Sequence, residues 1–174
     1  YLKPDADILE IGAGDGAVLS MLVERGARAT GFEMDAGAAR FITERWGTPV
    51  LVGDFDRHDF AGTRFDAVIM AHLIEHLIDP VASLRTVRSL LRPGGTLLIE
   101  TPNILHPKVS PRRVYSLAHN FHFSPRTLCR ALHVAGFEPL HVRVFRRDSF
   151  QVVARPASGA LPPSPQPSSQ VIST

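Results

Sequence analysis

Three glycines in a short run, Gly12, Gly14 and Gly16, are the strongest chemical signal in the sequence. They follow an apolar stretch of strand length that ends in Glu10 and Ile11, and they precede an amphipathic stretch of helix length. Glycine lets the backbone turn tightly and approach a ligand closely. The N-terminus of the following helix offers free N–H groups and the positive end of its dipole. The run therefore predicts a loop that binds a ligand carrying a carboxylate.

Two further acids stand where strands are expected to end. Glu33 closes the second apolar run, and its carboxylate can accept two hydrogen bonds from ribose hydroxyls. Asp54 closes the third run and can accept from the amino group of adenine, while Phe55 can cover the face of that ring. Because open α/β sheets bind ligands at the carboxyl ends of their strands, Glu10, Glu33 and Asp54 predict one edge of a nucleoside pocket.

The same loop also fits a dinucleotide-binding enzyme. Gly12, Gly14 and Ala17 match the pattern G-x-G-x-x-G/A, which such enzymes use with an acid at the second strand. Two local features argue against this reading: Glu10 stands two residues before the first glycine, and Gly16 gives the spacing G-x-G-x-G. The chain also ends in a close antiparallel pair of strands and has no room for a separate substrate domain.

Apolar runs alternate with amphipathic stretches of helix length, which is the order of a sheet with helices on both faces. The expected strands are 6–11, 29–32, 49–52, 65–71, 96–100, 140–145 and 150–154, and the expected helices are 17–25, 36–46, one from Asp79-Pro80 to the stop at Pro93-Gly94-Gly95 that includes Leu91, and one from Ser124-Pro125 to Gly136. Only four residues separate the last two strands, so they must pair antiparallel. We predict a Rossmann-like α/β fold with a seven-stranded sheet, order 3-2-1-4-5-7-6, the last strand antiparallel.

Residues 1–155 are expected to form this single domain. The segment 156–174 is rich in Pro, Ser and Gln and is predicted to be disordered. The long segment 101–123 carries His, Arg and aromatic residues, which is typical of a lid or a binding segment. Since the first residue is Tyr1 and not Met, we expect the true N-terminus to be missing.

The composition narrows the class of protein. The net charge is +2, and the only adjacent basic pairs are Arg112-Arg113 and Arg146-Arg147, whereas a nucleic-acid binder usually has a denser basic stripe. No apolar run reaches the roughly 18–20 residues of a membrane span, and no secretory leader is visible. Cys129 is the single cysteine, so no internal disulfide can form. We therefore expect a cytoplasmic protein without a nucleic-acid partner.

The motifs, taken in order, resemble class I S-adenosylmethionine-dependent methyltransferases. The resemblance is to the branch that contains ubiquinone-biosynthesis O-methyltransferases and many sugar and natural-product methyltransferases, and it covers about residues 7–154. The matching runs are Ile8–Gly16, Gly31–Asp35, Phe65–Ile69 with Glu75-His76-Leu77 and Asp79-Pro80, Leu91–Gly95, and Phe123-Ser124-Pro125 with Ala135-Gly136-Phe137.

The resemblance implies S-adenosylmethionine as the cofactor and methyl transfer to a small-molecule acceptor, with a hydroxyl oxygen as the expected target. It also implies that the N-terminal helix of full-length members, which often closes over the cofactor, is missing here. The implied cofactor contacts are Gly12, Gly14 and Gly16 under the methionine part, Glu33 at the ribose, Asp54 and Phe55 at the adenine, and Ala71 and His72 near the methionyl end.

His72, Glu75 and His76 spell H-x-x-E-H, the pattern of one class of zinc peptidases. That motif needs a full helix and a third ligand, whereas here it straddles a strand end and a short turn. In some O-methyltransferases of this branch an acidic pair with the histidine holds a divalent metal. His72 takes the place of one of those acids, so we expect no metal site.

His76 is instead a candidate general base, because imidazole titrates near neutral pH. The alternative is that Glu75 and His76 pack structurally, with Glu75 bonded to the loop. His119 and His122, with Tyr115, either line the acceptor pocket and supply a base or belong to a solvated loop with packed aromatic rings. Three more residues, His106, Arg112 and Arg113, are read as anion contacts or as ordinary surface.

Two competing functions remain. Adenine-N6 methyltransferases of this fold have an (N/D)-P-P-(Y/F) run after the fourth strand, where this chain has Ala71-His72-Leu73-Ile74. A non-catalytic module that only keeps the fold would not need the intact glycine loop and the acids at two strand ends. The sequence therefore favours a small-molecule methyltransferase and leaves lipid quinone, sugar, polyketide and peptide acceptors open.

Overall fold

The computed structural model describes residues 5–105, 119–145, 148–159 and 172–173 of the chain. Strands and helices alternate along most of it, as the sequence predicts. The strands are β1 (Asp7–Ile11), β2 (Arg28–Glu33), β3 (Val50–Val52), β4 (Phe65–Ala71), β5 (Leu91–Pro102), β6 (Phe137–Phe145), β7 (Ser149–Pro156) and β8 (Ile172–Ser173). The helices are α1 (Ala17–Glu24), α2 (Ala36–Trp46), α3 (Pro80–Leu90) and α5 (Pro125–Val134), with 3-10 turns η1 (Phe55–Arg57) and η2 (Ile74–His76).

One sheet contains all described strands, in the order β3-β2-β1-β4-β5-β7-β6-β8. The strands from β3 to β5 run parallel, and β7 is antiparallel to both β5 and β6. The predicted order 3-2-1-4-5-7-6 is thus confirmed. Two residues of the segment predicted to be disordered form β8, which pairs parallel with β6. Most of that segment lies outside the described residues, so its disorder stays a prediction.

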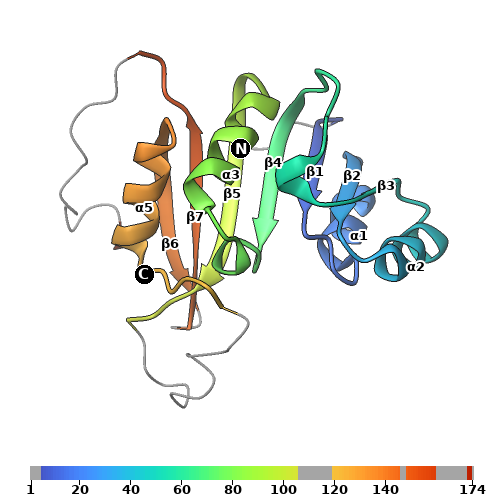
Figure 1. Cartoon of the computed structure of the whole chain (residues 1–174), viewed down its shortest axis with the longest axis horizontal. Coiled ribbons are helices and arrows are strands. Elements are labelled where there is room, and N and C mark those ends of the chain that lie inside the picture. The colour runs from blue at the N-terminus through green and yellow to red at the C-terminus, as the bar shows by residue number, and fades with distance from the viewer. Residues whose placement is uncertain (1–4, 106–118, 146–147, 160–171, 174) are drawn as a thin grey trace.

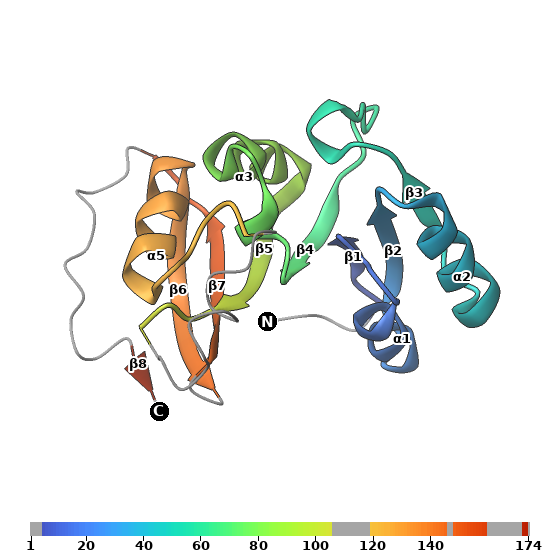
Figure 2. The same cartoon turned by 60° about the horizontal axis from the view of Figure 1, so that its bottom comes forward.

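Helices cover both faces of the sheet (Figures 1 and 2). On one face α1 and α2 bury Leu19, Leu22 and Ile42 against β1, β2 and β4. On the other face α3 and α5 close over the larger of two apolar clusters, which runs from β1 to β7. No helix in the described part of the chain is long and apolar enough to span a membrane; the longest have 11 residues.

The helices begin where polar side chains can bind their first free N–H groups. Asp35 accepts from the N–H of Ala38 at the start of α2, and Asp79 accepts from two amides at the start of α3. Ser124 forms a capping box with Thr127 at the start of α5. These caps fix the segments that lead from the strand ends into the helices, and those segments carry the candidate site.

The fifth strand differs from the sequence prediction. The helix was expected to include Leu91 and to stop at Pro93-Gly94-Gly95, with the strand beginning at residue 96. Instead α3 ends at Leu90, and Leu91 already pairs with Phe65 of β4 across an irregularity in the register. Pro93 explains the early end, because its ring clashes with the carbonyl four residues earlier in a helix and pushes the preceding residue to extended backbone.

Candidate active site

The glycine loop connects β1 to α1 at the carboxyl edge of the sheet. Gly12, Gly14 and Gly16 have φ angles of 76°, 56° and 78°, in the left-handed region that residues other than glycine rarely adopt. The N–H groups of Gly12 and Ala13 donate to the carbonyl of Phe32 at 2.8 and 3.2 Å, which ties the loop to β2. The loop therefore depends on glycine for its backbone shape.

The three glycines differ in what surrounds them. A Cβ atom at Gly12 would lie 3.0 Å from the Leu73 side chain, and one at Gly16 would lie 3.0 Å from Ile42. A Cβ at Gly14 would meet nothing within 4 Å. Gly12 and Gly16 thus let protein elements pack closely, whereas Gly14 presents bare backbone to open space that a ligand can reach.

Glu33 holds this loop in place. Its carboxylate accepts from the N–H of Gly14 at 2.9 Å through Oε2, and from the N–H groups of Met34 and Asp35 through Oε1. Each carboxylate oxygen has two lone pairs, so further hydroxyl donors can still bind. The predicted ribose ligand is therefore also a structural support of the glycine loop.

Asp54 and Phe55 follow β3 but lie in different surroundings. The Asp54 carboxylate caps η1 and is 3.4 Å from Arg57, and 47% of its side chain is exposed. Phe55 is only 7% exposed, because its ring packs against Phe32 and Phe60. Asp54 is accessible to a ligand, whereas Phe55 is mainly a core side chain whose contact with a base stays a prediction.

Glu10 lies beneath the loop and is the most unusual acid of the site. It is 2% exposed, and its Oε2 is buried without a hydrogen-bond partner. Burial raises the pKa of this carboxyl to about 8, and the neighbouring acids Asp15 and Glu33 act in the same direction. The N–H of Leu19, in the first turn of α1, partly offsets this rise.

His72 follows Ala71 at the end of β4, with a left-handed φ of 51°. Its Nδ1 lies 3.6 Å from Oε1 of Glu75, and its Nε2 lies 3.4 Å from Oε1 of Glu100. Bonding to Glu75, supported by Glu100, raises the pKa of His72. The ring therefore lies between two carboxylates, which favour its protonated form.

The structure brings the three predicted catalytic histidines together. The ring centroids of His76 and His119 are 4.9 Å apart, and those of His119 and His122 are 5.9 Å apart. Asn120 Nδ2 donates to the carbonyl of His76, and the N–H of Phe121 donates to the carbonyl of Glu75. Residues 119–121 are thus docked on η2. The residues His106, Arg112, Arg113 and Tyr115 lie outside the described residues.

Glu75 joins the two parts of the site. It is 2% exposed, and its Oε2 accepts from the Thr101 hydroxyl at 2.9 Å. Burial alone would raise its pKa, but the bonds from His72 and Thr101 lower it overall. Ligand atoms of Glu75, His76 and His119 all lie within 4.8 Å of one another, a spacing at which three side chains can hold a metal ion.

Sequence reasoning missed two residues of this network. Glu100 pairs with His72 and accepts from Gln151 Nε2 at 2.8 Å, which connects β4, β5 and β7. Glu100 stands near the carboxyl end of β5, so the rule that selected Glu33 also points to it. Gln151 carries no signal in the sequence, because its partner depends on the antiparallel register of β5 and β7.

The molecule also has a hollow of about 440 Å³ at the opposite edge of the sheet. Asp7, Arg28, Arg92 and Trp46 are among the residues that line it. It lies at the amino ends of the strands, whereas the glycine loop and the histidines lie at the carboxyl ends. We therefore assign the chemistry to the carboxyl edge.

Fold and site together define a class of protein. A sheet with the order 3-2-1-4-5-7-6, an antiparallel β7, a glycine loop after β1 and acids after β2 and β3 form a Rossmann-like methyltransferase domain. A family model described as a methyltransferase domain matches residues 1–142. The chain belongs to this family of class I S-adenosylmethionine-dependent methyltransferases, which confirms the resemblance read from the motifs.

Relatives and solved structures agree with this assignment. The ubiquinone biosynthesis O-methyltransferase of Aeromonas salmonicida is 29% identical over 149 residues, which are 74% of this chain and 61% of that protein. A methyltransferase structure from Mesorhizobium loti has a TM-score of 0.74 at 18% identity and covers 87% of this chain and 91% of its own. A Burkholderia thailandensis N1-methyltransferase, solved with 1,6-didemethyltoxoflavin and S-adenosylhomocysteine, has a TM-score of 0.74 at 23% identity, over 89% and 72%.

The chain spans 41–62% of the length of the curated relatives it matches. Its own residues nevertheless fit the family cofactor. Gly14 leaves open space above the loop, and Oε2 of Glu10 is a buried acceptor without a partner below it. Acids therefore surround the place where a cationic ligand with a ribose is expected.

Proposed function

We propose that this chain transfers a methyl group from S-adenosylmethionine to a hydroxyl oxygen of a small molecule. The family assignment supports S-adenosylmethionine as the methyl donor. The glycine loop and the acids at the carboxyl edge of the sheet support it as well. The Aeromonas salmonicida relative is named as an O-methyltransferase, which supports an oxygen acceptor. The observation that supports a hydroxyl acceptor is the histidine group formed by His76, His119 and His122, since a hydroxyl loses its proton as it is methylated, whereas a neutral amine attacks through its lone pair.

The positions of the residues support the following proposed cofactor contacts. Gly12, Gly14 and Gly16 shape the loop for the methionine part, with Glu10 beneath it, and Glu33 and Asp54 face the ribose and the adenine. Ala71 and His72 lie at the end of β4, toward the methionyl end. S-adenosylmethionine supplies a methyl group on a sulfonium, and transfer is an in-line displacement for which positioning is the main contribution.

The histidine group supplies the proton acceptor. Burial lowers the pKa of His119, which favours the neutral ring that can accept a proton. The rings of His76 and His119 contact each other, so an acceptor bound beside this pair lies near η2, which follows β4. A base in this position can take the hydroxyl proton as the oxygen attacks the methyl group.

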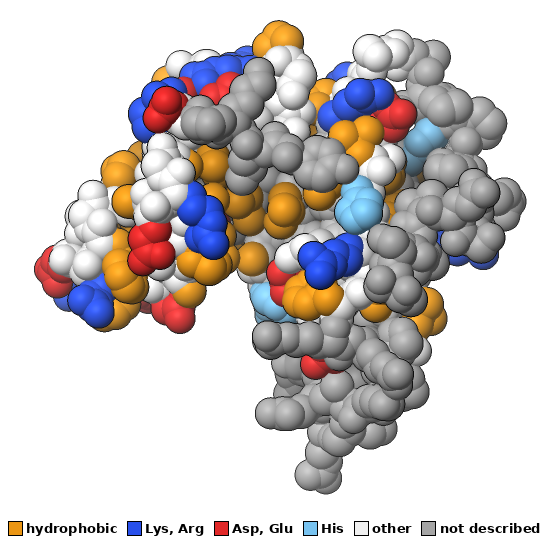
Figure 3. Space-filling view, turned by 180° about the vertical axis from the view of Figure 1, so that it is seen from behind, with side chains coloured by type: hydrophobic (Ala, Val, Ile, Leu, Met, Phe, Trp, Pro, Cys, Tyr) orange, Lys and Arg blue, Asp and Glu red, His pale blue; other side chains and the backbone are white. Residues whose placement is uncertain are grey.

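The distribution of charged side chains on one face also favours a small-molecule acceptor over a nucleic acid. On the face seen from behind, the basic side chains of the described residues lie among acidic and apolar ones and form no continuous band (Figure 3). A nucleic acid needs such a band to neutralise its phosphates. We keep the prediction of a cytoplasmic enzyme, in which the half-buried thiol of Cys129 stays reduced; burial raises its pKa to about 11.

An acceptor screen tests this proposal. The purified chain is incubated with radiolabelled S-adenosylmethionine and a panel of phenols, catechols, sugars, amines and carbon acids. We expect transfer to hydroxyl oxygen and a product that mass spectrometry identifies as a methyl ether. Transfer to amines or carbon acids alone would contradict the hydroxyl assignment while leaving the family assignment in place.

We also propose that the reaction needs no metal ion, although Glu75, His76 and His119 lie at a suitable spacing. Nδ1 of His72 lies 3.6 Å from Oε1 of Glu75, which raises the pKa of the ring, so His72 competes with a metal ion for this carboxylate. Treatment with EDTA should therefore leave turnover unchanged within error. A loss of turnover that Mg²⁺ or Zn²⁺ restores would contradict this expectation.

A further inference from the structure

The hollow at the amino edge of the sheet has no part in the proposed reaction. Its volume of about 440 Å³ lies within the range of about 300–1,000 Å³ that is typical of pockets for small organic molecules. Residues at the starts of β1, β2, β4 and β5 line it, together with the end of α2. The length of β1 separates it from the glycine loop, so a molecule bound in it lies away from the cofactor edge.

Part of the lining is apolar and includes an aromatic ring. Val23, Trp46 and Pro49 contribute to it, and 36% of Trp46 is exposed. The guanidinium of Arg45 lies over one face of the Trp46 ring, 4.8 Å from its centre, so a ligand in the hollow meets the edge or the other face. Aromatic rings pack well in both geometries, and the lining therefore favours a ligand with an aromatic ring.

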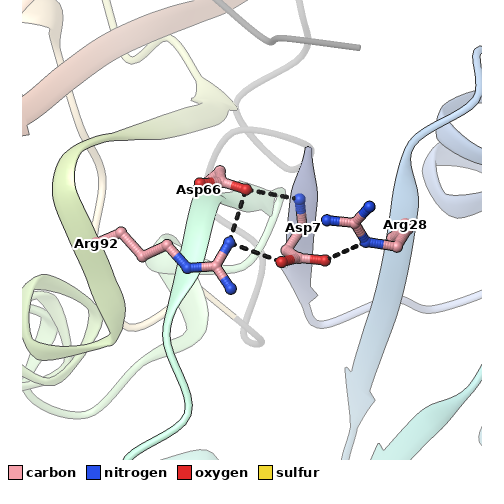
Figure 4. Close-up of polar contacts among 4 residues, drawn as sticks. All are labelled: Asp7, Arg28, Asp66 and Arg92. Carbon is pink, nitrogen blue, oxygen red and sulfur yellow. Dashed lines mark hydrogen bonds and ion pairs between the residues drawn. The ribbon is translucent and has the colours of Figure 1, made fainter. Parts of the chain in front are cut away.

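The charged part of the lining is mainly basic. Among the described residues the charged lining side chains are Asp7, Arg28, Arg64 and Arg92. The two carboxylate oxygens of Asp7 are already used, since Oδ1 accepts from Arg28 and Oδ2 lies 2.6 Å from Nη1 of Arg92 (Figure 4). Arg92 also bonds to Asp66. These two acids balance Arg28 and Arg92, so Arg64 gives the lining its excess positive charge.

The three arginines also have more N–H groups than the described residues use. A guanidinium has five N–H donors. Arg28 donates through Nε and Arg92 through Nη1, both to acids, while Nη1 of Arg64 donates to the carbonyl of Thr63. The side chains of Arg28 and Arg92 are 63% and 40% exposed. An anion can therefore bind here without breaking the ion pairs of Asp7.

We propose that this hollow binds a small aromatic carboxylate, whose carboxylate accepts from Arg64 and whose ring packs against Trp46. Arg64 has no acidic partner among the described residues, and a guanidinium matches the two oxygens of a carboxylate in geometry as well as in charge. No covalent bond changes, so binding is reversible. The proposal concerns a second site and does not depend on the acceptor of the methyl group.

The fluorescence of Trp46 reports on this site directly, because Trp46 is the only tryptophan of the chain. The purified chain is titrated with benzoate, with benzamide, which has the ring but no charge, and with acetate, which has the charge but no ring. We expect a saturable change in emission with benzoate and binding weaker by about tenfold or more for the other two. No saturable change with benzoate, or equal binding of acetate, would overturn the proposal.

Two variants test the position of the carboxylate. Arg64→Ala should weaken benzoate binding by about tenfold or more, since a bond between two charged groups is lost. Arg85→Ala is the matched control, because Arg85 is exposed on α3 and does not line the hollow. Calorimetry and fluorescence should agree for both variants. Unchanged benzoate affinity in Arg64→Ala contradicts the proposal, and the ligand series on the unmodified chain tests it without any substitution.

A competition experiment separates this site from the cofactor edge. Benzoate should bind equally well with and without saturating S-adenosylhomocysteine, because the two sites lie at opposite edges of the sheet. Loss of benzoate binding in the presence of S-adenosylhomocysteine would place benzoate at the carboxyl edge and overturn the proposal. If S-adenosylhomocysteine itself does not bind, the proposed cofactor site is contradicted, whereas the benzoate titration and the Arg64→Ala variant still decide on the hollow.

Discussion

We propose that single side chains at the carboxyl edge carry the chemistry, and His76 is the first that can be tested. His76→Ala should lower turnover by about 10²–10⁴, the usual contribution of a general base, while cofactor affinity stays nearly unchanged. Turnover should also fall at acidic pH as the histidine group takes up protons. Initial rates and calorimetric binding measure the two effects separately.

The double variant His119→Ala with His122→Ala completes this test. His133→Ala is the control, since His133 lies in the last turn of α5 and not in the histidine group. If His76→Ala and the double variant both keep full turnover, no histidine base exists. A neutral nitrogen acceptor, which attacks through its lone pair, or a carbon acceptor deprotonated by another group then becomes the better assignment.

Glu33 supports the glycine loop and is also the predicted ligand of the cofactor ribose. Glu33→Ala should weaken S-adenosylmethionine binding by about 1–3 kcal/mol, because ribose hydroxyls and the Gly14 amide both lose an acceptor. Glu33→Gln keeps one side-chain oxygen and should lose less. Calorimetry compares both with Glu44→Ala, which removes an exposed acid of α2. An affinity of Glu33→Ala equal to that of Glu44→Ala would contradict the ribose role.

Helix α5 begins just after His119 and His122, so the start of this helix helps to position both side chains. Ser124 and Thr127 form a reciprocal capping box, and the residues just before it carry His119 and His122. Ser124→Ala should cost about 1 kcal/mol of stability, or a fall in Tm of roughly 2–4 °C. Thermal unfolding measures this change, and Ser89→Ala in the last turn of α3 is the control. An unchanged Tm in Ser124→Ala would mean that the cap is not stabilising.

Most elements are predictable from the sequence because their signals are local. The periodicity of apolar residues and the caps at Asp79 and Ser124 locate the helices, and the short link between the last two strands requires their antiparallel pairing. The early start of β5 is not predictable, because it depends on how Leu91 pairs with Phe65 of another strand. The pairing of β8 with β6 is a long-range contact of the same kind.

The candidate site also has residues that local sequence signals predict and residues that depend on tertiary contacts. The glycine loop and the acids Glu33 and Asp54 follow from strand ends and spacing, so their edge was predictable. The burial of Phe55 was not, since it depends on Phe32 and Phe60. The meeting of His76 with His119 was not predictable either, because tertiary hydrogen bonds dock the later segment on η2.

At the scale of the whole molecule, the two edges of the sheet have different roles. The carboxyl edge carries the glycine loop, the acids Glu10 and Glu33 beside it, and the histidine group. At the amino edge, Asp7 of β1 lies 2.6 Å from both Arg28 of β2 and Arg92 of β5 (Figure 4). Asp66 of β4 accepts from Arg92 and from the N–H of Asp7. Ion pairs thus connect the four neighbouring strands β2, β1, β4 and β5 at the amino edge of the sheet.

Asp7 is the centre of this network, and its removal tests whether the network stabilises the fold. Hydrogen bonds from Arg28 and then Arg92 lower the pKa of Asp7 to about 2. Asp7→Asn should lower the free energy of unfolding by about 1 kcal/mol at pH 7, because the network is partly exposed and solvent screens it. Thermal unfolding should show a Tm lower by roughly 2–4 °C.

The pH dependence of this loss has a defined sign. A lowered pKa means that Asp7 stabilises the folded protein above its unfolded value of 3.8 and that this contribution disappears as pH falls toward 2. The difference in Tm between wild type and Asp7→Asn should therefore be constant from pH 7 to about pH 5 and should shrink below pH 4. Asp5→Asn is the control, since Asp5 acts on Arg28 only at longer range. A Tm difference that is absent at pH 7, or that persists unchanged at pH 2, would show that the carboxylate of Asp7 does not hold the four strands together.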